Sequence, residues 1–169
     1  MFGNVKTLRE LFEIELRYAY DAEKKLVDKG IPSMIEAASS PELRSALQAH
    51  LGETQTHVTR LQRVFGALDI EPDTKTNDIL DKMTAAAKDS TSNIEESSLR
   101  DAALIANGNV VEHYEIALYG TLVSFAKALG LQNIVGPLQE TLEEEKKADA
   151  KLSQLAESVT NTRASRVSA

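Results

Sequence analysis

Two glutamates at helical spacing are the first residues in this sequence that could do chemistry. Glu112 and Glu115 stand three positions apart in a segment whose apolar residues recur every three or four positions. Residues at this spacing are neighbours on one face of a helix, so the two carboxylates would lie side by side. They fall between two apolar flanks, where a helix bundle normally buries apolar side chains. Oxygen ligands in such a place suggest a metal ion.

Three other segments carry similar residues. Glu23 borders an apolar stripe early in the chain, and Glu53 and His57 flank another stripe four positions apart. Near the end, either Glu144 or Glu145 falls on the stripe, and the choice between them stays open. A neighbouring run of acidic and basic residues is equally typical of a solvated helix face with ion pairs. Surface salt bridges are the alternative for Glu23 and Glu53 too.

The elements that must position these residues are long helices. Apolar periodicity predicts them over about residues 5–38, 41–66, 97–129 and 133–159, the first with a kink at Pro32. Ser40 before Pro41 is typical of a helix start, and Gly130 of a helix end. A connection of about 30 residues, with a short helix near residues 79–88, joins the second helix to the third.

Two antiparallel helix hairpins with one long crossover predict an all-α, ferritin-like four-helix bundle. We expect residues 1–160 to form this bundle and residues 161–169 to be a flexible tail. If the hairpins turn near residues 40 and 130, the carboxylates of all four helices lie at one level. The two remaining histidines, His50 and His113, are interpreted as structural.

Several carboxylates in a low-dielectric interior need compensating cations. Di-metal carboxylate bundles use a Glu from each of two helices and a Glu-x-x-His from each of the other two. This chain supplies only part of the histidine pattern, because His57 follows Glu53 by four positions and the last helix has no histidine. An oxygen-rich site favours iron, with manganese or zinc as alternatives, and two ions are expected.

Composition excludes several kinds of site and argues against some binding partners and locations. The chain has no cysteine, which excludes disulfides, iron–sulfur clusters and a cysteine nucleophile. Its net charge of -7 argues against nucleic-acid binding. Its first 20 residues carry charges throughout and resemble no signal peptide, and no stretch is long and apolar enough for a membrane span. We therefore expect a cytoplasmic protein.

The sequence resembles the YciE/YciF-type stress proteins of the ferritin-like superfamily. The resemblance rests on ELRYAYDAEKKL (residues 15–26), HLGETQTHVTRLQRVF (50–65), VEHYEIALYGTL (111–122) and TLEEEKKADAKL (141–152). It implies a metal site between the helices, a link to stress and a homodimer. The family's first-helix motif falls on Tyr20 and Glu23, but Tyr18 stands where relatives usually have Asp.

Two functions follow as hypotheses. The first is a stress-response protein with a carboxylate-rich di-metal site that reacts with a small oxidant, either dioxygen or peroxide. The second is a non-catalytic dimeric bundle that acts by binding partners, with its metal structural or absent.

Overall fold

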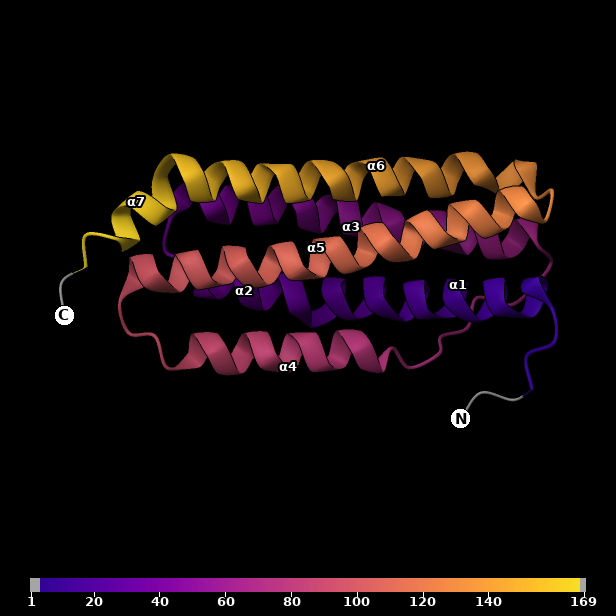
Figure 1. Ribbon diagram of the computed structural model, residues 1–169, viewed down its shortest axis with the longest axis horizontal. Helices are drawn as coiled ribbons and strands as arrows, with labels where there is room; N and C mark the ends of the chain where they lie inside the picture. The colour runs from indigo at the N-terminus through magenta and orange to yellow at the C-terminus, as the bar shows by residue number, and fades with distance from the viewer. Residues whose placement is uncertain (1–3, 168–169) are drawn as a thin grey trace.

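A computed structural model describes residues 4–167 and shows a helical bundle, with no strand among those residues. Figure 1 shows the long helices α3, α5 and α6 running alongside the rod made by α1 and α2, with α4 on the outside. Within the described residues, no helix combines the length and apolarity that a membrane crossing requires. In chain order the helices are α1 (Leu8–Lys25), the π-helix η1 (Leu26–Gly30), α2 (Ile31–Ala37), α3 (Pro41–Ala67), α4 (Asp78–Ser92), α5 (Ser97–Ala128), α6 (Gln132–Leu155), the π-helix η2 (Ala156–Thr160) and α7 (Asn161–Ala164).

Local sequence signals account for the helix boundaries. Thr7 and Glu10 form a reciprocal capping box at the start of α1. The Ser40 hydroxyl accepts a hydrogen bond from the backbone N–H of Leu43, which begins α3 as predicted. Gly130 has a φ of 71°, a conformation that costs glycine little, and the chain turns there from α5 into α6.

Three details differ from the expectations. The first helix begins at Leu8 rather than near Val5, and the π-helix η1 lies directly before Pro32, which is in the first turn of α2. The wider π turn leaves room for a proline ring that would otherwise crowd the preceding turn. The crossover helix extends to Ser92. The expected loose tail begins with one helical turn, α7, so its flexibility stays a prediction for the residues after it.

The apolar core consists of two clusters at different levels of the bundle. One surrounds Phe12, Phe65 and Tyr119, where the N-terminal half of α1 meets the C-terminal halves of α3 and α5. The other surrounds Leu26 and Leu47 near the opposite end. On α3, α5 and α6, polar residues lie between the positions that belong to the two clusters. The bundle is thus divided by a buried polar layer, held between two apolar blocks.

The crossover is fixed to the bundle by a buried asparagine. Asn77 caps α4 by accepting a hydrogen bond from the Leu80 backbone N–H, and its backbone N–H donates to Asp21. Its side-chain amide donates to the hydroxyl of Tyr114 on α5. Leu80 on α4 is fully buried in the second apolar cluster. These contacts hold α4 against α1 and α5.

A buried aspartate joins the two hairpins. The carboxylate of Asp101 on α5 accepts hydrogen bonds from the backbone N–H groups of Ser39 and Ser40, at 2.8 and 2.7 Å. These groups lie in the turn that leads into α3. Because Asp101 is almost completely buried, its removal would leave two donors without partners.

We therefore expect Asp101→Ala to lower the free energy of unfolding by about 2–3 kcal/mol in urea denaturation. Asp89→Ala is the control, since it removes an exposed aspartate of α4. A loss of similar size in both variants would contradict the proposed role of Asp101.

Candidate metal centre

The polar layer between the two apolar clusters consists mainly of acidic residues. Glu23 on α1, Glu112 and Glu115 on α5, and Glu145 on α6 are all buried, and so is His57 on α3. Each of the four long helices therefore contributes to one cluster. The structure brings these five predicted residues together.

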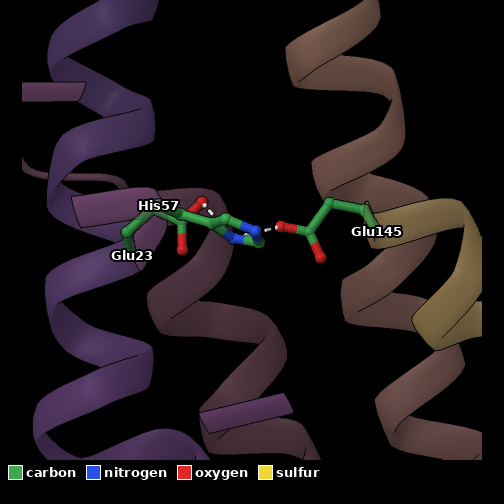
Figure 2. Close-up of side chains that lie close together, drawn as sticks. All are labelled: Glu23, His57 and Glu145. Carbon is green, nitrogen blue, oxygen red and sulfur yellow. Dashed lines mark ion pairs between the residues drawn. The ribbon is translucent and has the colours of Figure 1, made fainter. Parts of the chain in front are cut away.

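His57 lies at the centre of the first group. Figure 2 shows its ring between Glu23 on one side and Glu145 on the other. Its Nδ1 atom is 3.4 Å from Oε1 of Glu23 and 2.9 Å from Oε1 of Glu145. Glu23 also accepts a 2.5 Å hydrogen bond from the hydroxyl of Tyr119. Glu23, His57 and Glu145 each offer one atom within the span that a single metal ion could bridge.

A second group shares Glu145 with the first. It consists of His50, Glu112 and Glu145, and its ligand atoms also lie close enough for one ion. Nε2 of His50 is 3.2 Å from Oε1 of Glu112 and 4.0 Å from Oε2 of Glu145. Glu145 could thus serve two neighbouring ions, one beside each histidine.

Two further glutamates lie at the edge of the cluster. Oε2 of Glu144 is 2.9 Å from Nε2 of His57 and 2.7 Å from the guanidinium of Arg60, and the Glu144 side chain is 24% exposed. Oε2 of Glu53 is 3.5 Å from Nδ1 of His50, and the Glu53 side chain is 52% exposed. Both contact a histidine from outside and face away from the shared centre.

Burial and mutual repulsion change the acidity of the inner carboxyl groups. Burial raises the pKa of Glu115 well above its usual value, and the nearby charges of Glu145, Glu23 and Glu112 raise it further. Burial likewise raises the pKa of Glu23 and of Glu145, although His57 partly offsets the effect. The inner carboxylates therefore lack sufficient positive charge from the side chains around them.

The pKa values of the two histidines are also raised, but by the neighbouring carboxylates and against the effect of burial. Burial alone would lower the pKa of His57, but the adjacent Glu145 and Glu23 outweigh it and raise the pKa to about 10. The pKa of His50 is also raised well above its usual value, because Glu112 and Glu53 outweigh its burial. In the metal-free protein, two imidazolium ions thus supply positive charge to the carboxylates.

Several buried atoms of the cluster still have no hydrogen-bond partner among the described residues. Nδ1 of His57 belongs with them, since its short approach to Glu145 is not aligned for a hydrogen bond. The oxygens among them are Oε2 of Glu23, Oε2 of Glu112, Oε1 of Glu115 and Oε2 of Glu145. Buried acceptors without donors are costly, and cations would satisfy them. The donor set, oxygen with imidazole, suits iron, manganese or zinc.

The two remaining histidines differ in their surroundings. His50, which periodicity indicates to be structural, lies against Glu112 and is also placed where it could hold a metal ion. The signal was its place seven positions before His57, which puts both rings on one face of α3. His113 is 70% exposed and contacts Asp149 outside the cluster. Tyr18 lies outside the cluster, with the ammonium group of Lys75 over its ring.

The fold and the buried cluster define a ferritin-like helical bundle with a carboxylate and histidine centre. The chain matches the family described as "Domain of unknown function (DUF892)" over residues 7–165, and it belongs to that family. It is 37% identical to the protein YciF of Escherichia coli K12 over 165 residues, which are 95% of this chain and 97% of YciF. The resemblance to YciE/YciF-type proteins is confirmed.

Solved structures agree with this assignment. The crystal structure of the E. coli stress protein YciF matches with a TM-score of 0.88 and 36% identity, over 93% of this chain and 99% of that one. YcfI of Rhodopseudomonas palustris, described as a proposed structural protein, matches with a TM-score of 0.87 and 38% identity, over 90% and 98%. A protein of Xanthomonas campestris pv. campestris, with 22% identity and a TM-score of 0.73 over 95% and 98%, shares the fold.

The raised pKa of His57 predicts how stability depends on pH. An imidazolium with a folded pKa near 10 and an unfolded value near 6.5 stabilises the fold fully below pH 6.5. That stabilisation is lost as the pH rises toward 10. The raised pKa values of Glu23 and Glu145 act in the same direction. We expect chelator-treated protein to lose on the order of a few kcal/mol of unfolding free energy between pH 6.5 and 10.

Urea denaturation across this range measures the effect, and NMR of the His57 ring should show both N–H protons at pH 8. His113→Gln removes an exposed histidine and should leave the slope unchanged. A flat stability profile, or a neutral His57 ring at pH 8, would show that the carboxylates do not hold a proton on this histidine.

Proposed function

We propose that this protein binds two ions of iron, or alternatively manganese or zinc, in the polar layer of its bundle. One position is formed by Glu23, His57 and Glu145, and the other by His50, Glu112 and Glu145. The observation that carries the proposal is the set of buried carboxylate oxygens without hydrogen-bond donors among the described residues. Within each group, the ligand atoms lie close enough together to bind one ion.

The surrounding residues orient the ligands. Because Nε2 of His57 contacts Glu144, its Nδ1 atom is directed toward Glu23 and Glu145. Arg60 holds Glu144 in place and also donates to the hydroxyl of Thr141. A carboxylate on the outer nitrogen of a ligating histidine fixes the ring and raises its basicity. Glu144 is therefore proposed as a positioning residue and Glu145 as a ligand.

Glu115 and Glu53 have less direct parts in this proposal. Glu115 is buried beside the centre with an unpartnered oxygen, so it is available as an additional ligand. Glu53 lies 3.5 Å from the outer nitrogen of His50, a looser contact than the 2.9 Å hydrogen bond between Glu144 and His57. Of the predicted ligands, Glu53 and Glu144 are therefore proposed to contact histidines rather than metal ions.

Iron or manganese ions held by these residues would supply, when bound, the redox chemistry for a reaction with dioxygen or peroxide. The protein's own residues supply the enclosure. Apolar clusters close the layer on both sides, and the hydroxyl of Tyr119 donates to Glu23. Because relatives include a stress protein, we propose a stress-response role for this chain as well. The homodimer stays a prediction.

Elemental analysis tests the metal proposal. After anaerobic loading, we expect about two metal ions for each chain, the number held by di-metal carboxylate bundles. Glu145→Gln should lose both, because Glu145 belongs to both positions. Glu143→Gln is the matched control, since Glu143 is exposed and lies two residues away on α6.

Circular dichroism separates a lost site from a lost fold. Glu145→Gln removes a buried charge, so this variant should stay folded without metal. A wild-type protein without iron, manganese or zinc after loading would overturn the proposal. Iron that binds but shows no optical change with dioxygen or peroxide would support the alternative, a structural metal in a non-catalytic bundle.

A further inference from the structure

A cavity of about 300 Å³ lies between α3 and α6 and reaches the second metal position. His50 and Glu112 form part of its lining, and Oε2 of Glu112 has no hydrogen-bond partner among the described residues. The first position lies deeper, because both Glu23 and His57 have no exposed surface. The cavity therefore connects solvent to one half of the centre. Its volume is at the small end of the range for ligand pockets.

The lining of the cavity is apolar between its charged mouth and the floor formed by His50 and Glu112. Lys147 and Lys151, one turn apart on α6, are exposed at the mouth. Leu47 and Leu152 line the cavity and are almost fully buried. Small side chains widen the space between them, namely those of Ala46, Ala49 and Ala148.

The two lysines have no ion-pair partner among the described residues. Glu143, the acidic residue one turn before Lys147, is paired with Lys146 instead. Glu53 is the acidic residue at the mouth, and it faces His50. Two ammonium groups one turn apart can hold one anionic head group. At the floor, His50 already lies between the carboxylates of Glu112 and Glu53, so no unpaired cation is available there for such a head group.

We propose that this cavity binds a small amphipathic carboxylate, with its head group at Lys147 and Lys151 and its apolar tail directed between Leu47 and Leu152 toward Glu112. The binding follows from the cavity alone. The consequence, that the end of the tail is presented to a metal ion, rests on the proposed function.

Octanoate is the probe, and calorimetric titration of metal-free protein measures its binding. We expect the Lys147→Ala, Lys151→Ala double variant to bind octanoate on the order of five- to tenfold more weakly. Ala148→Phe should abolish binding by filling the cavity. The matched control removes two exposed lysines of α4, Lys82→Ala and Lys88→Ala, with the same change in net charge, and should bind normally. Octanol should bind without dependence on the lysines.

Paramagnetic broadening tests the orientation. In protein loaded with Co(II), the methyl protons of octanoate should broaden more than the protons next to its carboxylate. Greater broadening beside the carboxylate would overturn the proposed orientation. Absence of octanoate binding to the metal-free protein, or equal binding by the two double variants, would overturn the site itself. These titrations contain no metal, so failure of the metal proposal is distinguishable from failure of this one.

Discussion

The structure depends on how negative charge is balanced inside the bundle. Four buried glutamates from α1, α5 and α6 meet in one layer between the two apolar clusters. Uncompensated carboxylates in such a place would cost many kcal/mol. In the metal-free state, the protons on His50 and His57 supply part of the compensation. Metal ions and protons are therefore alternatives for the same carboxylates, and metal binding must release protons.

The same constraint explains why neighbouring glutamates on α6 have different roles. Successive residues on a helix are rotated by about 100°, so Glu145 faces the layer while Glu144 points along its edge. The edge position is useful because Arg60 and His57 meet Glu144 there. Burial raises the pKa of Glu144, but Arg60 and His57 outweigh it, so its pKa is lowered. Glu144 stays ionised and anchors the ring of His57. Glu145 is instead repelled by the other buried carboxylates.

Much of the fold could be predicted from the sequence, because helix periodicity and caps are local signals. Ser40, Pro41 and Gly130 marked boundaries that the structure confirms. Pro32 indicated an irregularity in the first helix, but not its form, a π-helix at residues 26–30, because no local signal specifies a π turn. The buried layer was also predictable, from Glu23, Glu112 and the other acidic residues that interrupt apolar stripes.

The rotation of α3 was harder to predict. Glu53 resembles a ligand by type and spacing, but the buried position beside it is Thr54, whose hydroxyl bonds back to the His50 carbonyl. A shift of one residue moves a side chain by about 100°, which apolar spacing alone does not resolve. Packing against α6 decides it and turns His50 and His57 inward. The ligand set therefore follows from tertiary contacts as well as from residue type.

The two halves of the centre are chemically similar but unequal in access. Each has one histidine of α3, one other glutamate and a share of Glu145. The half with Glu23 and His57 is closed by Tyr119 and the first apolar cluster. The half with His50 and Glu112 borders the cavity. If the proposed ions are bound, exchange with solvent or ligand is therefore expected at the second position rather than at the enclosed first one. Because Glu145 belongs to both positions, a change of ligand at the open position would alter the surroundings of an ion at the closed position.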